Sequence, residues 1–255
     1  NDFSEMKMIL KPSLHVGESY MDGSLILEEG NIHDLLKLIF INSRFNTDHW
    51  VMKVDRIRRA IINKIVFSNY IVKSKNNVAH HYDLSDTLYD LFLDKDRQYS
   101  CAYFNSPNDT LEQAQMNKKE LIAKKLLKEE DQNVLDIGSG WGGMASYLSK
   151  RSNVNVKGVT LSEEQFAFSK QRKIDESLDK VEYALQDYRK VEESYDRIVS
   201  VGMFEHVGTP HYQEFFNKVY ELLNEKGVAL IHTIGRVDQP TTNDAWIEKY
   251  IFPGG

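Results

Sequence analysis

The stretch 134–143 constrains the fold of this chain more than any other, because a short apolar strand runs directly into a glycine-dense turn. Three apolar residues predict a strand buried in a parallel sheet: Val134, Leu135 and Ile137. Three glycines then allow the backbone to approach a ligand closely: Gly138, Gly140 and Gly142. A helix is predicted at 144–150. Such a strand-turn-helix junction presents free backbone N–H groups, as doubly wound folds do when they hold a nucleotide.

The end of the second predicted strand separates two cofactor classes. This strand, 154–160, ends at Thr160, where a dinucleotide enzyme usually places an acidic residue to hold a ribose. The available carboxylates are instead Asp136, beside the glycines, and Asp187, after the third strand. Together these residues favour S-adenosylmethionine (SAM) over NAD. Turn capping is the alternative role for both carboxylates.

Helices and strands alternate along the rest of the chain. Helices are predicted at 111–128, 142–151, 162–176 and 211–223, and strands at 133–137, 154–160, 181–186, 195–201 and 227–234. This alternation indicates an α/β fold with a doubly wound, mostly parallel, Rossmann-like sheet. Ligands of such sheets lie at the carboxyl ends of the strands, so the segments after each strand are the functional candidates.

The length of 255 residues suits one large domain and a smaller one. We predict a small N-terminal domain at 1–75, an aromatic linker at 76–110 and the α/β domain at 111–255. Within the first domain, 17–23 predicts a turn-rich piece and 32–40 a helix. Because the chain starts in mid-pattern at Asn1 and stops at Gly255, we expect further sequence to follow.

Composition indicates a cytoplasmic globular protein. Hydrophobic residues make up 41% and charged residues 27%, and neither a secretory signal nor a membrane-spanning run is visible. Cys101 is the only cysteine, so an internal disulfide is excluded.

The net charge of −6 is unevenly distributed, since basic residues at 53–75 outnumber the single acidic residue, Asp55, by six. Apolar residues at helical spacing lie among them, so the segment could rest on an anionic membrane surface. A solvated helix packed on the small domain is the alternative. No nucleic-acid motif accompanies the charges.

Acid–base residues follow the last two predicted strands. Glu205 and His206 come after strand 195–201, and His232 lies near the end of strand 227–234. If these strands are adjacent, Glu205 and His232 share a site, and polar groups buried there need partners. His206 fits a helix start or packing equally well. A zinc site is disfavoured because no short ligand spacing occurs.

The segment 80–104 is rich in aromatic residues, which could wall an apolar site. Those residues are Tyr82, Tyr89, Phe92, Tyr99, Tyr103 and Phe104. Cys101 in this segment is either a nucleophile or an inert thiol, and the sequence around it decides for neither.

Six motifs in this order resemble the cyclopropane fatty acid synthase family. They are Tyr-Asp-Leu-Ser at 82–85, Gln-Tyr-Ser-Cys-Ala-Tyr-Phe at 98–104, Leu-Asp-Ile-Gly-Ser-Gly-Trp-Gly-Gly at 135–143, Gly-Val-Thr-Leu-Ser at 158–162, Asp-Arg-Ile-Val-Ser-Val-Gly-Met-Phe-Glu-His-Val-Gly at 196–208 and Leu-Ile-His-Thr-Ile-Gly at 230–235. Residues 17–23 are similar to the N-terminal domain of the bacterial branch that acts on phospholipid.

The resemblance implies a class I SAM-dependent methyltransferase. Such an enzyme adds a methylene across a cis double bond of a phospholipid acyl chain and releases S-adenosylhomocysteine (SAH). In the family the alkene attacks the sulfonium methyl, and the resulting carbocation loses a proton from the new methyl group. A carbocation requires a dry pocket with π faces, which agrees with the aromatic segment.

The resemblance also implies bound bicarbonate as the base. Its ligands would be Cys101, the Val201 carbonyl, Glu205 and His232, which makes Cys101 a wall of the site and not a nucleophile. A carboxylate beside an anion needs a shared proton, so either Glu205 or bicarbonate is expected to be protonated. A tyrosine that completes this site in the family would lie beyond Gly255.

For SAM, the resemblance implies a set of binding residues from four segments: Tyr99, Ser100, Gly138, Gly140, Thr160, Leu161 and Gln165, with Asp187 and Tyr188 on the adenine side. The implied partner is unsaturated phospholipid, reached by peripheral association at the inner face of the membrane. A homodimer is also implied. A lipid methyltransferase with a methyl-branched product, or a non-catalytic module that binds SAM and lipid, remains an alternative.

Overall fold

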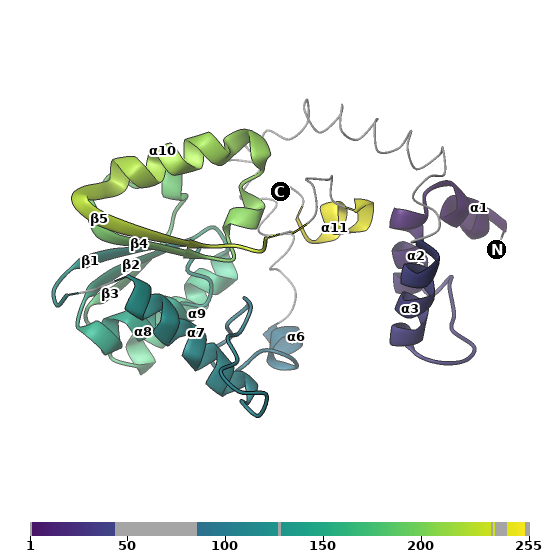
Figure 1. The fold of residues 1–255 in the computed structure, drawn as a ribbon, viewed down its shortest axis with the longest axis horizontal. Coiled ribbons are helices and arrows are strands. Elements are labelled where there is room, and N and C mark those ends of the chain that lie inside the picture. Colours follow the sequence, from purple (N-terminus) through teal and green to yellow (C-terminus); the bar gives the residue numbers. More distant parts are fainter. Residues whose placement is uncertain (1, 44–85, 127–128, 236, 238–243, 253–255) are drawn as a thin grey trace. The chain divides into compact units, whose positions relative to one another are not determined.

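The computed structural model describes residues 2–43, 86–126, 129–235, 237 and 244–252 (Figure 1). Contacts divide the chain into two units: the N-terminal residues with the segment after 235, and the central residues that end at Gly235. The predicted domain boundary at 75 and the basic segment 53–75 lie outside the described residues, as does Tyr82. These predictions therefore stay predictions.

The central unit contains a parallel sheet of five strands in the order β3-β2-β1-β4-β5. The strands are β1 (Asn133–Ile137), β2 (Asn155–Thr160), β3 (Val181–Leu185), β4 (Tyr195–Val201) and β5 (Leu223–His232). The helices are α6 (Asp86–Asp90), α7 (Leu111–Lys125), α8 (Gly143–Ser152), α9 (Glu163–Asp175) and α10 (Tyr212–Leu222). The predicted doubly wound α/β fold is confirmed.

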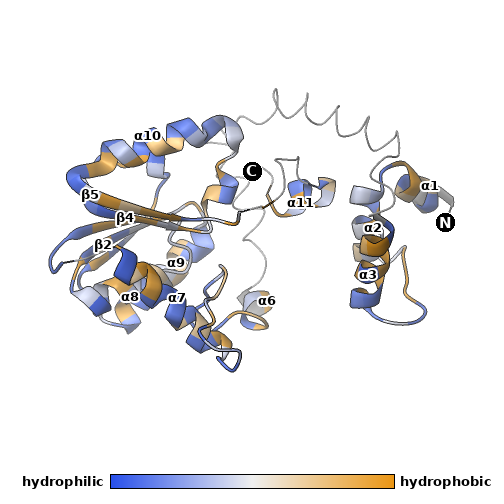
Figure 2. Ribbon diagram, viewed as in Figure 1, coloured by the Kyte–Doolittle hydropathy of each residue, from blue (hydrophilic) through white to orange (hydrophobic). Residues whose placement is uncertain are grey.

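Helices cover both faces of the sheet, with α10 on one side and α7 and α8 on the other (Figure 1). Successive residues of β1 point to opposite faces, so Val134 packs in the core beneath α7 and α8 while Leu135 packs beneath α10. Both side chains are fully buried. Figure 2 shows the matching pattern, since β4 becomes hydrophobic toward its carboxyl end, whereas hydrophilic and hydrophobic stretches alternate along α10.

The last strand differs from its prediction at both ends. β5 starts at Leu223, four residues earlier than expected, and ends at His232. Its pairing with β4 is irregular at the start, because Tyr195 pairs with Leu223 but Arg197 pairs with Val228. The regular part of the strand therefore begins close to the predicted position.

Among its described residues, the N-terminal unit contains α1 (Asp2–Leu10), α2 (Pro12–Met21), α3 (Ile32–Ser43) and α11 (Ala245–Tyr250). The turn predicted at 17–23 is confirmed only at residues 22–23, because α2 continues to Met21. Gly17 lies inside this helix, where a Cβ would be 2.6 Å from Cδ1 of Trp246 on α11. Glycine is needed there for the close approach of two helices and not for a turn.

Glu18, next to Gly17, also joins α2 to α11. Its carboxylate accepts hydrogen bonds from Lys249 Nζ and from Tyr250 Oη, which lies at 2.9 Å. These bonds hold the pKa of Glu18 down at about 2. Among the described residues, no helix combines the length and the apolar character required to cross a bilayer.

Candidate active site

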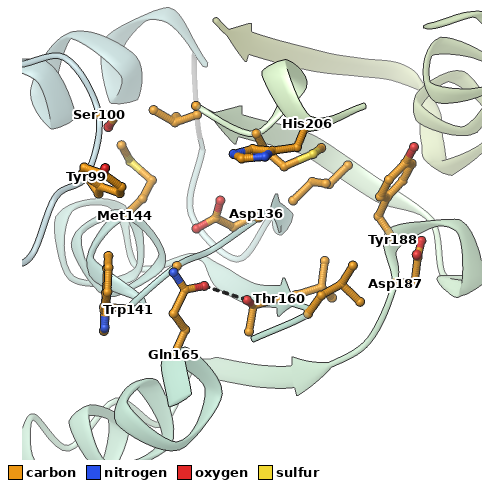
Figure 3. A pocket seen from close by; sticks show the side chains of 18 of the residues that line it. Tyr99, Ser100, Asp136, Trp141, Met144, Thr160, Gln165, Asp187, Tyr188 and His206 are labelled. Atoms are coloured by element: carbon orange, nitrogen blue, oxygen red, sulfur yellow. Dashed lines mark hydrogen bonds between the residues drawn. The ribbon is translucent and has the colours of Figure 1, made fainter. Parts of the chain in front are cut away.

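The carboxyl ends of the strands in the central unit open into a cavity of about 150 Å³ (Figure 3). Turns that follow β1, β2, β3 and β4 form most of its wall, and the segment 97–100 closes the remaining side. All ten predicted SAM residues line it: Tyr99, Ser100, Asp136, Gly138, Gly140, Thr160, Leu161, Gln165, Asp187 and Tyr188. The structure brings these residues together, although their contact with SAM stays a prediction.

The glycine loop after β1 forms the floor of the cavity. Gly138, Gly140 and Gly142 have φ angles of 78°, 55° and 83°, in the left-handed region that side chains disfavour. The backbone N–H groups of Gly138 and Ser139 both donate to the carbonyl of Val159 at 3.0 Å, which ties the loop to β2. Apart from the two adjacent residues, no atom of the described part of the chain lies within 4 Å of a Cβ built at Gly140, so open space adjoins the loop there.

Two buried side chains fix the outer part of this loop. Tyr183 Oη donates to the Gly142 carbonyl at 2.8 Å, and Arg172 Nη1 donates to the Trp141 carbonyl at 3.1 Å. Arg172 also forms an ion pair with Asp96 at 2.9 Å. The loop conformation is therefore set before a ligand binds, which lowers the entropic cost of binding.

Thr160 and Gln165 form the edge of the cavity after β2. Ser162 caps α9 by accepting a bond from the Gln165 backbone N–H at 3.2 Å. Thr160 Oγ1 donates to Gln165 Oε1 at 2.9 Å (Figure 3), and this bond leaves the amide nitrogen of Gln165 as a donor.

Asp187 caps a turn and also lines the cavity. It caps the short turn 188–190 by accepting from the backbone N–H of Arg189, and it pairs with the Arg189 guanidinium at 2.7 Å. It also lines the cavity after β3, together with Tyr188. Burial raises the pKa of Tyr188 above its usual value.

Asp136 is a second buried carboxyl group in the cavity (Figure 3). The backbone N–H of Ala145 donates to it, but its Oδ2 has no hydrogen-bond partner among the described residues. Burial raises the pKa of Asp136 to about 7. A buried carboxyl with an unpaired oxygen fits a ligand that presents a cationic or hydroxyl group.

Glu205 and His232 lie after neighbouring strands, as their positions in the sequence suggested. Val201 at the end of β4 pairs with His232 of β5, and the Gly202 N–H donates to the His232 carbonyl at 3.0 Å. Glu205 Oε1 accepts from the backbone N–H of Ile234 at 2.7 Å. Within the described part of the chain, Glu205 Oε2 and His232 Nδ1 are buried without a hydrogen-bond partner. Two unpaired polar atoms at adjacent strand ends are unusual unless a ligand satisfies them.

Of the four predicted bicarbonate ligands, only Val201 lines the cavity; Cys101, Glu205 and His232 are not part of its wall. Cys101 has an exposed side chain. It follows Ser100, whose Cβ is 3.4 Å from a Cβ built at Gly202, so the segment passes over the end of β4. The catalytic roles of these four residues stay predictions.

Part of the aromatic segment adjoins the cavity. Tyr89 is buried, and its ring centroid lies 4.7 Å from that of Trp141 and 5.6 Å from that of Tyr99. Tyr103 and Phe104 are about half exposed and are not cavity residues. Of the predicted aromatic residues that the structure describes, Tyr99 lines the cavity, and Tyr89 packs behind it against Tyr99 and Trp141.

Sequence reasoning missed several lining residues. Met203 and His211 follow β4, and His206, whose role was left open, also lines the cavity. Their position after a strand was the signal that could have identified them. Arg97 carried no such signal, because it lies before the first strand in the chain.

A sheet of this order, with a cavity over its carboxyl ends, has the Rossmann-like fold of class I SAM-dependent methyltransferases. A family model described as mycolic acid cyclopropane synthetase matches residues 71–255. The chain therefore belongs to the cyclopropane synthase family, as its motifs predicted.

Among relatives, cyclopropane-fatty-acyl-phospholipid synthase of Escherichia coli K12 is 39% identical over 253 residues, which cover 98% of this chain and 63% of that protein. The chain thus spans less than two thirds of that relative. Among solved structures, a cyclopropane synthase from Mycobacterium tuberculosis has a TM-score of 0.65 and 37% identity, covering 71% of this chain and 68% of that one. A mycolic acid cyclopropane synthase complexed with SAH and CTAB has a TM-score of 0.60 and 39% identity, covering 62% and 55% of the two chains.

Proposed function

We propose that this protein transfers a methylene from SAM to the cis double bond of an unsaturated acyl chain in membrane phospholipid, forming a cyclopropane. The observation that carries the proposal is the pair of buried, unpaired atoms Glu205 Oε2 and His232 Nδ1, at the end of the sheet that also carries the SAM-type cavity. A SAM-binding module without chemistry has no need for this second polar site.

The residues of the cavity divide naturally along the length of SAM. Asp187 and Tyr188, after β3, form the end suited to adenine. Thr160 and Gln165 offer polar atoms for the ribose, and the open space at Gly140 allows close contact with the amino-acid part. The unpaired carboxyl oxygen of Asp136 suits the positive charge of SAM.

The second site fits a small planar anion with both donor and acceptor atoms. Bicarbonate, held by Glu205, His232, the Val201 carbonyl and Cys101, would supply a general base for the proton that the new methyl group loses. His232 Nδ1 can donate or accept, and Glu205 Oε2 can accept once the anion carries the proton. Because Cys101 is exposed, its side-chain position is the least constrained among the four proposed bicarbonate ligands.

Phospholipid is the acceptor that the comparisons support best. The E. coli relative whose name specifies phospholipid matches 98% of this chain, whereas a mycolic acid synthase matches 70%. The N-terminal unit therefore has a counterpart in the phospholipid enzyme. We further infer peripheral membrane association through the basic segment 53–75, and a homodimer.

The test is product analysis with the intact protein, SAM and vesicles of unsaturated phosphatidylethanolamine, with and without bicarbonate. We expect acyl chains that gain one CH₂ unit without a double bond, and more product when bicarbonate is present. A methyl-branched product would favour a lipid methyltransferase, and absence of any methylated lipid would refute the proposal. Co-sedimentation with the same vesicles measures membrane association.

Glu205→Gln tests the second site directly. Because the amide cannot share a proton with the anion as a carboxylate does, we expect turnover to fall by about 100-fold while SAM affinity is retained. Glu225→Gln is the matched control, since Glu225 is an exposed residue on β5. Full activity of Glu205→Gln would remove this residue from the mechanism.

A further inference from the structure

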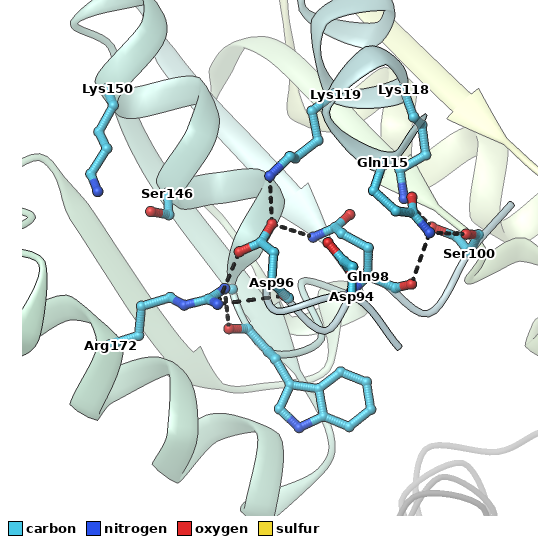
Figure 4. Close-up of polar contacts among 12 residues, drawn as sticks. Asp94, Asp96, Gln98, Ser100, Gln115, Lys118, Lys119, Ser146, Lys150 and Arg172 are labelled. Atoms are coloured by element: carbon cyan, nitrogen blue, oxygen red, sulfur yellow. Dashed lines mark hydrogen bonds and ion pairs between the residues drawn. The ribbon is translucent and has the colours of Figure 1, made fainter. Parts of the chain in front are cut away.

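Helix α7 holds the segment that closes the cavity. Gln115 Nε2 donates to the carbonyls of Gln98 and Ser100, at 3.2 and 3.0 Å. One turn later, Lys119 forms an ion pair with Asp96 at 2.6 Å (Figure 4). These contacts place the backbone of 96–100 along α7.

Lys118 lies between these anchors and has a different environment. Only 3% of the residue is exposed, and its Nζ donates to Ser100 Oγ at 2.7 Å. Among the described residues, Ser100 is its one hydrogen-bond partner and no carboxylate lies within ion-pair distance. A buried ammonium that faces only a neutral hydroxyl is costly, and such groups are common at functional sites.

The charges around Lys118 come from two segments. Burial, which is the largest cause, acts together with the charge of neighbouring Lys119, and the pKa of Lys118 is lowered to about 8. Asp94, Asp96 and Cys101, on the segment that α7 holds, act in the opposite direction. The ammonium is therefore charged at neutral pH but close to its titration range.

This bond determines what the Ser100 hydroxyl can do. A protonated lysine donates but cannot accept, so Ser100 Oγ must be the acceptor and its own hydrogen points elsewhere. No described residue accepts that hydrogen, and Ser100 lines the cavity. Ser100 is thus held as a hydrogen-bond donor toward the cavity.

The position of Ser100 indicates which part of the ligand would accept. Ser100 lies over Gly202 at the end of β4, whereas Asp187 and Tyr188 follow β3, three strands away in the sheet order. If adenine occupies the β3 end, the amino-acid part of SAM extends toward Ser100. The acceptor that this part offers is its carboxylate.

We propose that Lys118 is a positioning residue for the SAM carboxylate, acting through the Ser100 hydroxyl that it holds as a donor. The proposal rests on SAM as the cofactor, and therefore on the proposed function. In this arrangement only the Ser100 hydroxyl separates the Lys118 ammonium from the SAM carboxylate, so the positive charge of Lys118 also attracts the carboxylate.

The test compares two ligands that differ only in the carboxylate: SAM and decarboxylated SAM. Their dissociation constants are measured by calorimetry at pH 7 with the intact protein and its Lys118→Met variant. We expect the variant to bind SAM about tenfold more weakly, the loss typical of one hydrogen bond to a charged group, and to bind decarboxylated SAM as the wild type does. Lys125→Met, at an exposed position of the same helix, should bind both ligands normally.

An equal loss for both ligands, or no loss for either, would overturn the role of Lys118 while leaving the proposed function intact. Wild-type protein that binds neither ligand would overturn both. Ser100→Ala covers the case in which Lys118→Met fails to fold, since it should show the same selective loss of SAM affinity. A selective loss with Ser100→Ala supports the proposal, and an unselective one refutes it.

Two further measurements separate positioning from structural support. In the Ser100→Ala background, Lys118→Met should cause no additional loss of SAM affinity, because both changes break the same link. The advantage of wild type over Lys118→Met should also shrink as pH rises through about 8, where the uncharged amine can accept the Ser100 hydrogen. A pH-independent advantage would contradict the donor argument.

Discussion

Replacing Asp136 by asparagine should stabilise the protein at neutral pH and weaken its binding of SAM. The side chain is buried, its Oδ2 is unpaired, and burial raises its pKa from 3.8 to about 7. In the unfolded chain the carboxyl ionises near pH 4, whereas in the folded protein it keeps its proton until about pH 7. The folded state therefore binds more protons in this window, and stability falls as pH rises through it.

The size of this effect follows from the pKa difference. About three pKa units correspond to about 4 kcal/mol of stability lost between pH 4 and pH 7. Asparagine avoids this loss because it does not ionise, but its buried amide nitrogen lacks an acceptor, at a cost of about 1–3 kcal/mol. Asp136→Asn should thus be less stable than wild type near pH 4 and more stable, by about 1–3 kcal/mol, at pH 8.

Urea unfolding of both proteins without SAM, at intervals from pH 5 to pH 8, measures the difference. Asp179→Asn at an exposed turn is the control and should parallel wild type at every pH. Calorimetry at pH 7 should show weaker SAM binding by Asp136→Asn, because the variant cannot supply a negative charge. Stability curves of wild type and Asp136→Asn that run parallel across this range would refute the reasoning.

Two glycine substitutions give further tests. Gly17→Ala places a Cβ 2.6 Å from Trp246 Cδ1, so we expect a loss of about 1–3 kcal/mol in thermal or urea unfolding, and unchanged stability would contradict the packing of α11 on α2. Gly140→Ala should cost about 1 kcal/mol through its φ of 55° and should also weaken SAM binding, because the Cβ enters ligand space. Gly23→Ala, at a φ of 78° and with no non-adjacent described residue within 4 Å of its Cβ, carries the same strain without the effect on SAM. Equal SAM affinities for the two variants would argue against the cavity as the SAM site.

The sequence predicted the sheet well because its strands carry local signals. The apolar run at β1 and the glycines after it occur within ten residues, and strand, turn and helix can be recognised from them alone. The same logic located Asp136 and Thr160, which lie in the last two residues of β1 and β2, and Asp187, which follows β3. Position after a strand is sufficient to place a residue at the ligand edge of a parallel sheet.

The errors arose where a distant contact determines the local structure. The residues around Gly17 have the composition of a turn. Glycine is needed there, however, because Trp246, more than 200 residues away in the chain, packs against it. Lys118 belongs to a highly charged helix, where lysines are normally exposed, and only packing against 94–103 buries it. Neither feature has a periodicity or spacing that a sequence could reveal.

The order of the strands accounts for the separation of the two sites. The chain runs outward from β1 through β2 to β3 and then returns to β4 on the other side, so the direction of winding reverses between β1 and β4. Asp136 and Gly138 end the strand on one side of this switch point, and Gly202 and Met203 follow the strand on the other. A ligand that binds at β1, β2 and β3 would therefore have its far end at β4, the strand that Glu205 follows and that pairs with His232 of β5. In the proposed function, this order brings the methyl donor and the base to neighbouring strand ends while separate residues hold each of them. Substitutions at Asp136 should consequently change SAM affinity, and those at Glu205 should change turnover.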